Sequence, residues 1–400
     1  MRKTQDAGAC SRSRFSTISF SDPIEYQWID GVEPLALYEP GGYHPVMVDD
    51  LLHRRYRIVD KLGHGGYSTI WLAHDEQTTR YVALKVSISG QMLPRREPSI
   101  LRTLSESVST AQETTAPEVF DASTTLPRVL DVFNVRGPNG IHVCYTKTLA
   151  QGNLKDASFS RLFPIEVARV LTARLALAVS LIHSRGFVHG GGGALYLGRI
   201  AEEFTLDDAH GLILGDFGEA FAPATEERLG GDCNTPVAMR APEALFEPDT
   251  PVSYPADIWS LGTAIWEILG MGFIFSESAT MNEIVAQQID VLGAQGLPLA
   301  WREHWERPNT EELVTNTEVE VPRRPAGDRE VWPPLEQAFE VFVQKYRREQ
   351  EATGVFGEEE TKGILDLMRG MLRFKPEERM TIQEVLQSEW MTKWALPRDA

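Results

Sequence analysis

The pattern of apolar and polar positions divides the chain into a part that favours strands and a part that favours helices. Residues 55–62 alternate between polar and apolar side chains, and residues 81–86 form a short apolar run, so both indicate strands. Beyond residue 164, apolar side chains recur at helical spacing as far as Gly186, a residue type common at helix C-termini. This predicted buried stripe comprises Val167, Val170, Leu171, Leu175, Ala178, Leu181 and Ile182.

The same reasoning predicts the remaining elements. Ile100, Leu101 and Leu104 share one face of a short helix. Other strands are expected over residues 129–135, 141–145 and 212–215, and other helices over residues 257–269 and 364–372. Residues 1–55 are rich in serine and proline and predict a partly disordered extension, whose later half lies against the folded body. The fold class is therefore α+β, with a small strand-rich lobe over residues 56–148 and a larger, mainly helical lobe over residues 149–400.

The composition limits the partners and the compartment. Acidic residues outnumber basic ones by 57 to 39, and the net charge of −18 argues against direct nucleic-acid binding. Such a surface suits a basic partner such as an Arg-rich peptide, although solubility alone also accounts for it. The three cysteines are far apart and favour a reducing compartment over disulfides or a zinc site. No apolar run reaches the roughly 18 residues of a membrane span, so we expect an intracellular protein, cytoplasmic and/or nuclear.

A glycine-rich hairpin precedes the strand at residues 81–86. Glycines let backbone N–H groups approach phosphate oxygens, because no Cβ stands in the way. The strand carries one lysine, Lys85, in the sequence V-A-L-K, and a lysine supplies a point charge for phosphates. A G-x-G sequence alone also serves plain turns. Together with V-A-L-K it predicts a phosphate site, and the sequence lacks both the G-K-[ST] of a P-loop and the strand-to-helix context of a dinucleotide site.

These motifs resemble those of protein kinases. Gly63, Gly65, Ser68 and Ile70 match the glycine-rich loop of that family, and Lys85 matches the lysine of its V-A-I-K strand. The sequences S-T-I-W-L-A and G-P-N-G-x-H-x-C are most similar to those of SR-protein kinases, which phosphorylate Arg/Ser-rich splicing factors. The resemblance implies a bilobal kinase fold that binds ATP and Mg²⁺. The residues that it implies for ATP binding are Leu62, Gly63, His64, Gly65, Gly66, Tyr67, Ser68, Ile70, Ala83, Lys85, Glu97, Thr148 and Leu149.

The resemblance also implies a glutamate that pairs with Lys85, and Glu97 is the candidate. Pro98 follows it, and proline fits the first turn of a helix, so Glu97 would stand at a helix N-terminus. The alternative for Glu97 is an exposed carboxylate favoured by the helix dipole. Lys147 falls near the position where kinases usually carry an apolar side chain, just before the hinge that contacts adenine.

The large lobe carries further motifs of the family. Asp216 opens a D-F-G sequence and would hold Mg²⁺. Thr235 is either a phosphorylation site or, as we favour, a structural loop residue, and Asp257 supports the catalytic loop, caps its helix, or does both. Glu243 of A-P-E would pair with Arg379 in a structural role. An insert at about residues 289–334 again resembles SR-protein kinases. The activation-segment and structural residues implied by the resemblance are His189, Phe217, Gly218, Thr235, Glu243, Asp257 and Arg379.

The expected catalytic loop departs from the family. Kinases carry H-R-D-L-x-x-x-N there, in which the Asp accepts the proton of the substrate hydroxyl and the Asn holds Mg²⁺. Read without gaps, the His, Arg, Asp and Asn positions are taken by His189, Gly190, Gly191 and Tyr196, and a shifted register puts Arg199 at the Asn. Residues 167–201 contain no Asp or Glu, so no register restores the base. Its loss costs about 10²–10⁴ in rate, or ~3–5 kcal/mol.

Three functions are compatible with these features. The first is an ATP-binding Ser/Thr kinase-like protein that acts on a basic, Arg/Ser-rich protein, with phosphoryl transfer impaired. The second is a pseudokinase that works as a nucleotide-regulated binding or scaffold module. The third, a scaffold that binds no nucleotide, fits less well, because the glycine-rich hairpin, Lys85 and Asp216 are all present. We expect ATP binding with slow transfer, a monomer, and no contact with membranes.

Overall fold

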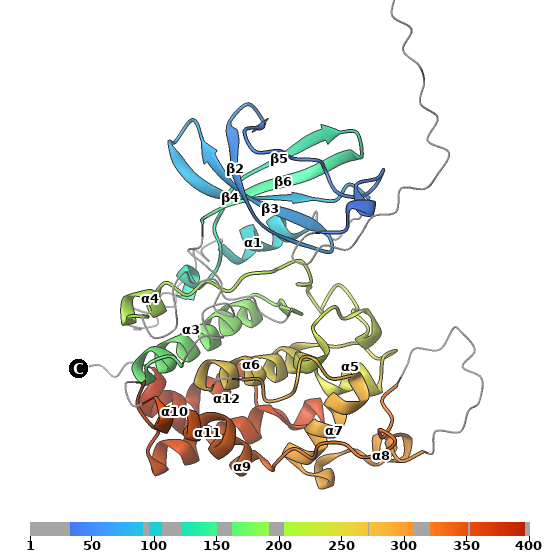
Figure 1. The fold of residues 1–400 in the computed structure, drawn as a ribbon, viewed down its shortest axis with the longest axis vertical. Helices are drawn as coiled ribbons and strands as arrows, with labels where there is room; N and C mark the ends of the chain where they lie inside the picture. Colours follow the sequence, from blue (N-terminus) through green and yellow to red (C-terminus); the bar gives the residue numbers. More distant parts are fainter. Residues whose placement is uncertain are drawn as a thin grey trace, which may run out of the picture.

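The computed structural model describes residues 33–90, 96–105, 122–149, 162–191, 204–270, 272–307, 321–350 and 353–396. These residues form two lobes, with the strand-rich lobe above the helical one in Figure 1. The predicted α+β bilobal fold is therefore confirmed. Residues 1–32 of the expected extension and residues 308–320 of the expected insert lie outside the described residues.

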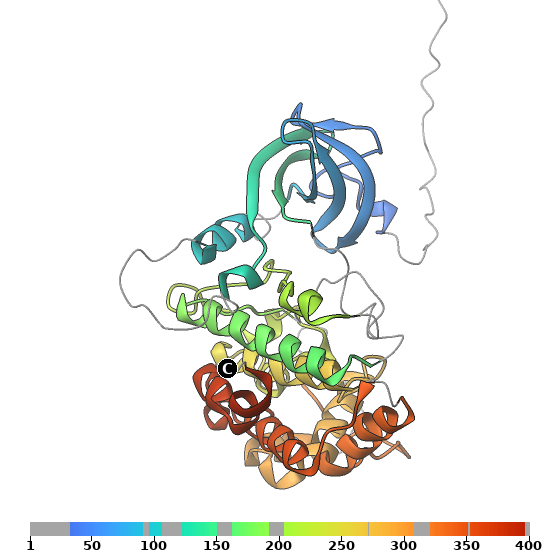
Figure 2. The same ribbon diagram turned by 90° about the vertical axis from the view of Figure 1, so that its left-hand side faces the viewer.

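The small lobe is built on one antiparallel sheet with the strand order β1-β2-β3-β4-β6-β5. Figure 2 shows that the sheet curves strongly around its own core. Tyr56 and Ile58 point into this core, whereas Arg57 and Val59 are exposed, which confirms the predicted alternation. The strands are β1 (Leu51–Leu52), β2 (Tyr56–Gly65), β3 (Ser68–Asp75), β4 (Arg80–Ser87), β5 (Val129–Gly137) and β6 (Gly140–Lys147).

The segment before Tyr56 is part of the small lobe. Strand β1 pairs with β2, although the sequence placed the start of this lobe at residue 56. Tyr43 is 1% exposed, and its carbonyl accepts a hydrogen bond of 2.6 Å from the Asn139 side chain in the β5–β6 turn. Glu33 forms an ion pair with Lys61 of β2. From residue 33 onward the extension therefore lies against the sheet, as far as the described residues show.

Helix α1 (Glu97–Ser105) lies between the sheet and the large lobe, as Figure 2 shows. Its predicted apolar face is confirmed, because Ile100, Leu101 and Leu104 are all buried. Pro98 occupies the second helical position, where a missing N–H costs no hydrogen bond. The buried face joins a core that continues into the large lobe.

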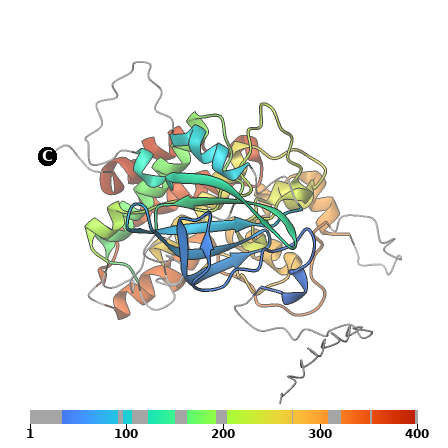
Figure 3. The ribbon, with the colours of Figure 1, turned by 90° about the horizontal axis from the view of Figure 1, so that it is seen from above.

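The large lobe is helical, and Figure 3 shows the sheet lying across the top of it. The predicted stripe from residue 167 to residue 182 lies on a helix of 20 residues, packed against a second helix that buries Trp259 and Trp266. The α-helices are α3 (Ile165–Ser184), α4 (Leu206–His210), α5 (Pro242–Phe246), α6 (Tyr254–Leu269), α7 (Met281–Leu292), α8 (Leu299–Trp305), α9 (Leu335–Phe339), α10 (Lys345–Glu349), α11 (Glu358–Met371) and α12 (Ile382–Gln387).

Short 3-10 and π-helical segments connect these helices. The 3-10 segments are η1 (Leu35–Leu37), η4 (Ala122–Thr125), η6 (Gly230–Asp232), η7 (Val237–Met239), η8 (Ala294–Gly296) and η11 (Pro376–Glu378). The π-helical segments are η9 (Glu340–Gln344) and η12 (Met391–Ala395). Segment η9 continues directly from α9 into α10.

The strand expected over residues 212–215 is represented by a single β-bridge residue, Leu214. Leu212 and Leu214 are buried, as a central strand would be, and this segment forms no ladder with another strand among the described residues. The Leu214 N–H donates to the Thr125 carbonyl of η4 over 2.8 Å. A short apolar run does not distinguish a strand from a buried extended segment.

The insert region begins with the end of α7 and contains helix α8. Trp301 of α8 stacks on Phe246 of α5, with ring centroids 4.9 Å apart. Its indole N–H donates to the Glu247 carboxylate over 2.7 Å. These contacts attach the described part of the insert firmly to the large lobe. Of all the helices described, none combines the length and the apolar character that a membrane crossing requires.

Candidate active site

A cavity of about 280 Å³ lies where the two lobes meet. The small lobe contributes the hairpin between β2 and β3, a lysine of β4 and the first residue of α1. The large lobe contributes the segments on either side of residue 216 and one residue of the expected catalytic loop. The lining residues are Gly65, Gly66, Tyr67, Ser68, Lys85, Glu97, Gly191, Asp216, Gly218, Glu219, Asn234 and Pro236.

The glycine-rich hairpin forms the roof of this cavity. Gly65 pairs with Ser68 across the turn between β2 and β3, so the tip is a tight reversal. A Cβ added at Gly63, Gly65 or Gly66 would meet no atom within 4 Å, which shows that these backbones face open space. The Tyr43 hydroxyl donates to the Gly65 carbonyl over 2.8 Å and holds the hairpin from outside.

Other residues of the hairpin are exposed at its tip and become buried where β3 begins. Leu62, His64 and Tyr67 are exposed, Ile70 is half-buried, and Ser68 is buried at the start of β3. Backbone N–H groups at an open glycine-rich tip can bind phosphate oxygens directly.

A buried ion pair forms the back of the cavity. The Lys85 ammonium lies 2.5 Å from the Glu97 carboxylate, and both side chains are buried. Burial works to raise the pKa of Glu97, but the charges of Lys85 and Lys147 and hydrogen bonding outweigh it and lower that pKa. Helix α1 begins at Glu97, so the predicted N-terminal position of this residue is also found.

A second lysine shares the face of the sheet that carries Lys85. In the β4–β6 register, Ala83 lies opposite Lys147 and Lys85 lies opposite Tyr145, and opposite residues of an antiparallel pair point to the same side. Burial and the charge of Lys85 lower the pKa of Lys147. The chain continues into Thr148, which is half-buried, and Leu149, which is exposed, and neither is among the residues that line the cavity.

Asp216 presents its carboxylate to the cavity. It is exposed, and its φ of 61° lies in the left-handed region, which is rare for a residue other than glycine. Phe217 beside it is fully buried against the His189 ring, with centroids 4.9 Å apart at 81°. Gly218 follows in a turn at the cavity wall. Phe217 and its neighbours thus fix the position of the carboxylate.

The residues around Asp216 fit a magnesium ion held together with a nucleotide. Within the described residues, no group of three or more His, Cys, Asp or Glu side chains forms a complete metal cage. Mg²⁺ usually binds through one or two carboxylates, phosphate oxygens and water rather than through such a cage. A single exposed carboxylate below an open glycine-rich hairpin meets that requirement.

One buried carboxylate supports the expected catalytic loop from below. The His189 and Gly190 N–H groups donate to Asp257 over 2.7 and 3.0 Å, and the His183 ring nitrogen lies 2.9 Å from the same carboxylate. Burial works to raise the pKa of Asp257, and the bond to His183 outweighs it, so that this pKa is lowered. The geometry supports the ungapped register, which puts Gly191 at the position of the base. Tyr196 and Arg199 lie outside the described residues.

The activation segment is attached to the same loop. The Thr235 hydroxyl donates to the Gly190 carbonyl over 2.8 Å, and the side chain is 7% exposed. Arg240 donates twice to the Thr235 carbonyl, over 2.8 and 3.0 Å. Further along, Arg379 donates to Glu243 over 2.7 Å in a buried pair, as the resemblance implied. An inward hydroxyl of this kind suits a structural role for Thr235.

The sequence analysis missed three residues that line the cavity, Glu219, Asn234 and Pro236. Glu219 directly follows D-F-G, and its carboxylate is held by Arg228 over 2.5 Å and by the Asn234 amide over 3.0 Å. The only available signal was the presence of a carboxylate immediately after the motif. Its orientation depends on contacts with residues 9 and 15 positions away, which no local pattern reports.

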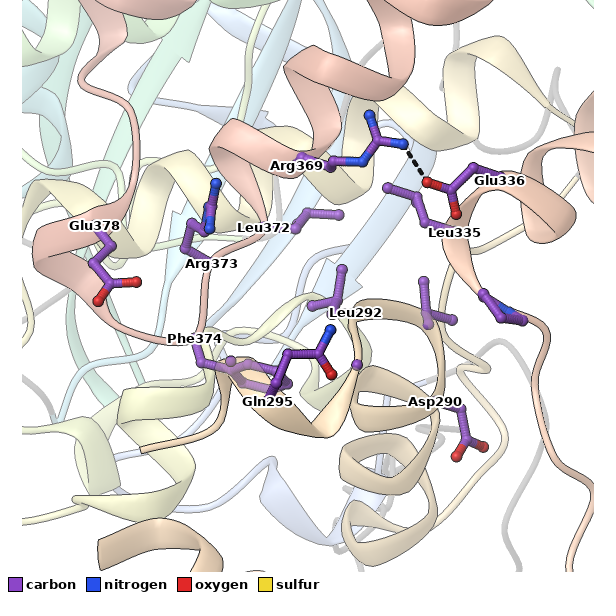
Figure 4. Close-up of a pocket in the computed structure, with 14 residues that line it drawn as sticks. Asp290, Leu292, Gln295, Leu335, Glu336, Arg369, Leu372, Arg373, Phe374 and Glu378 are labelled. Carbon is purple, nitrogen blue, oxygen red and sulfur yellow. Dashed lines mark hydrogen bonds and ion pairs between the residues drawn. The ribbon is translucent and has the colours of Figure 1, made fainter. Parts of the chain in front are cut away.

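A larger cavity of about 490 Å³ lies at the base of the large lobe, away from the hairpin (Figure 4). Leu292, Leu335 and Leu372 line it together with charged residues, and Figure 4 shows Arg369 directed at Glu336. None of the residues in this cavity belongs to the glycine-rich hairpin, V-A-L-K or D-F-G. The interlobe cavity is therefore the candidate active site.

Comparison with known proteins decides the family, since a protein kinase domain model matches residues 56–391. The chain belongs to the protein kinase family. A serine/threonine protein kinase of Aspergillus fumigatus is 25% identical over 90% of each chain. The protein kinase dsk1 of Schizosaccharomyces pombe is 36% identical over 38% of this chain and 28% of its own length, and human SRSF protein kinase 3 is 37% identical over 27% and 18%. The resemblance of this kinase-family chain to SR-protein kinases is thereby confirmed.

Proposed function

We propose that this member of the protein kinase family binds ATP with Mg²⁺ in the interlobe cavity and transfers the γ-phosphoryl group to Ser or Thr of a basic protein. The transfer is slow, because Gly191 stands where the family carries its base. The observation that carries the proposal is the buried Lys85–Glu97 pair beneath the glycine-rich hairpin. The Glu97 carboxylate fixes a buried lysine that lines the cavity, where its charge can meet the phosphates of a ligand.

Each part of the site would contact a different part of the bound MgATP. The hairpin N–H groups would contact phosphate oxygens, Lys85 would neutralise the α- and β-phosphates, and Thr148 and Leu149 would border adenine. Asp216 would hold Mg²⁺, and that ion would reduce the negative charge of the phosphates. Positioning and charge neutralisation account for most of kinase catalysis, so transfer can persist at a reduced rate without the usual base.

The acceptor class follows from charge and from the relatives. The net charge of −18 gives the chain a field that attracts cationic peptides. One relative is named SRSF protein kinase 3, and SR-type sequences also match the hairpin and the β5–β6 turn of this chain. An Arg/Ser-rich peptide is therefore the acceptor that we propose.

A pseudokinase function is the second candidate, and the two glycines at positions 190 and 191 favour it. Neither has a side chain that can accept a proton or hold a substrate hydroxyl. In that case the chain would bind nucleotide and partner, with negligible turnover.

The test is transfer of radiolabelled phosphate from ATP to an Arg/Ser peptide. We expect label above that of a Lys85→Ala/Asp216→Asn control, and a gain of about 10²- to 10⁴-fold in Gly191→Asp, which restores the base. MgATP at about 100 times its Kd should stabilise the folded protein by about 2.7 kcal/mol. Stabilisation without label would favour the pseudokinase, and the absence of stabilisation would contradict nucleotide binding altogether.

A further inference from the structure

One carboxylate lies in the cavity without a part in the proposed function. Glu219 lines the interlobe cavity together with Lys85, Asp216 and Gly191. It comes from the activation segment rather than from the catalytic loop. In the cavity, Glu219 lies on the same side as Asn234 and Pro236, the residues that flank Thr235. All three are far along the chain from the hairpin that would cover the phosphates.

The pairing of two segments places Glu219 against the catalytic loop. Val188 and Phe221 form an antiparallel bridge, with N–H···O distances of 2.8 and 3.1 Å. Two residues further in each direction, Gly190 and Glu219 therefore lie opposite one another. A Cβ on Gly190 would lie 3.6 Å from the Glu219 Cβ. The side chain thus starts beside the residue that precedes Gly191.

The Glu219 carboxylate is held in a fixed orientation. Arg228 donates to Oε2 over 2.5 Å, and the Asn234 amide donates to Oε1 over 3.0 Å. Arg228 is itself buried and stands 5.5 Å from the Phe221 ring centroid. A carboxylate has about four lone-pair positions, so Oε1 keeps one that can accept a hydroxyl proton.

We propose that Glu219 is a catalytic residue that replaces the missing aspartate, an inference that rests on the proposed function. The hydroxyl oxygen of the acceptor Ser or Thr forms a bond to the γ-phosphorus, while the bond from that phosphorus to the β,γ-bridging oxygen breaks. ADP leaves with that electron pair. The hydroxyl proton passes to Glu219 Oε1 and then to water. Asn234 and Arg228 are positioning residues that aim the carboxylate.

The competing account is that Glu219 only anchors the activation segment through Arg228. Both accounts predict damage from Glu219→Gln, so one substitution does not separate them. They differ in what a second carboxylate at residue 191 would do. If Glu219 supplies proton acceptance, that carboxylate makes Glu219 dispensable, whereas an anchor stays necessary.

The experiment measures kcat for the Arg/Ser peptide, the KM for that peptide and the MgATP affinity in five proteins and two controls. The five are the parent, Glu219→Gln, Glu219→Asp, Gly191→Asp and the double variant Gly191→Asp/Glu219→Gln, and one control is the inactive Lys85→Ala/Asp216→Asn. Glu226→Gln is the matched control, because Glu226 also contacts Arg228, at 3.5 Å, but does not line the cavity. Thermal unfolding of each variant checks that it is folded.

We expect Glu219→Gln to lower kcat by about 10- to 100-fold with MgATP affinity unchanged, Glu219→Asp to recover part of the loss, and Glu226→Gln to stay within about twofold of the parent. The double variant should match Gly191→Asp. A double variant as inactive as Glu219→Gln, or a Glu219→Gln as active as the parent, would overturn the inference and leave the proposed function standing. A parent no more active than Lys85→Ala/Asp216→Asn would overturn both.

Discussion

Gly190 links the expected catalytic loop both to helix α6 and to the activation segment. Its N–H donates to Asp257, its carbonyl accepts from Thr235, and its φ is 69°. That φ lies in the left-handed region, which glycine occupies at little cost. A Cβ here would approach the Glu219 carbonyl oxygen to 2.8 Å, so the site also leaves no room for one. The two glycines of the loop are consequently not equivalent.

Alanine substitution at Gly190 and at Gly191 should show which of the two glycines is required by its backbone conformation. Gly190→Ala should lower the free energy of unfolding by about 1–3 kcal/mol, because the left-handed conformation costs an L-residue roughly 1–2 kcal/mol and the Cβ contact adds to it. Gly191 carries no positive φ, but an added Cβ would lie 3.1 Å from the His189 ring, so Gly191→Ala should lower the free energy of unfolding by less than Gly190→Ala does, by about 1 kcal/mol at most. Urea denaturation measures both values. Equal destabilisation by the two substitutions would contradict this account.

Local sequence motifs predicted several residues of the site. They missed residues whose positions depend on contacts between distant parts of the chain. Lys85, Glu97 and Asp216 were found because each stands in a local motif whose order survives in the sequence. Glu219 was not, since its position depends on a bridge between segments 33 residues apart in the chain. The strand expected over residues 212–215 is reduced to one bridge residue in the described part of the chain, because apolar content indicates burial but not the hydrogen-bond partner.

At the scale of elements, the glycine-rich hairpin is held by a segment outside the motifs. Tyr43 lies before β1, yet its hydroxyl donates to the Gly65 carbonyl at the hairpin tip. The same residue is tied to the β5–β6 turn through Asn139, so the extension connects the hairpin tip to that turn. Helix α1 is likewise linked to the activation segment, by an ion pair of 2.5 Å between Arg96 and Glu226. Sequence motifs identified the elements but not these links.

Removing the Tyr43 hydroxyl should loosen the hairpin and weaken nucleotide binding. A hydrogen bond of this kind contributes about 0.5–1.5 kcal/mol, so Tyr43→Phe should weaken MgATP binding by about 2- to 10-fold. Tyr38→Phe is the matched control, since the Tyr38 hydroxyl meets Glu33 rather than the hairpin. Isothermal titration with MgATP compares the three proteins. An unchanged affinity in Tyr43→Phe would show that the contact does not position the hairpin.

At the scale of the whole molecule, the sheet of the small lobe has a core of its own, whereas helix α1 shares the core of the large lobe. The small lobe is a curved sheet of neighbouring strands, whereas the large lobe buries three tryptophans completely, Trp259, Trp266 and Trp390. The core that begins on α1 runs into this helical body, and the cavity lies along that junction. The motifs predicted both lobes because each has its own periodicity. They did not predict that the sheet begins before residue 56.

The acidic character of the molecule should make peptide binding depend on salt. With a net charge of −18, attraction to an Arg/Ser peptide is screened as ionic strength rises, and the Debye length falls below about 8 Å above physiological salt. The peptide Kd should weaken by about 3- to 10-fold between 50 and about 300 mM NaCl. Fluorescence anisotropy with a labelled peptide measures this change. A peptide of equal length with Glu in place of Arg should not bind, and salt-independent affinity would rule out electrostatic capture.

The position of Tyr43, Val46 and Leu52 has a practical consequence for the folding unit. All three side chains are buried, and Val46 and Leu52 belong to the core of the small lobe, although they precede the region that matches the family model. A fragment excised at residue 56 would leave the outer face of that core open to water and the roof of the cavity unsupported. Its edge strand β2 would lose β1 as a neighbour and offer free backbone groups to other chains, a recognised cause of aggregation. The unit that folds on its own therefore begins before residue 56, where the match to the family model starts.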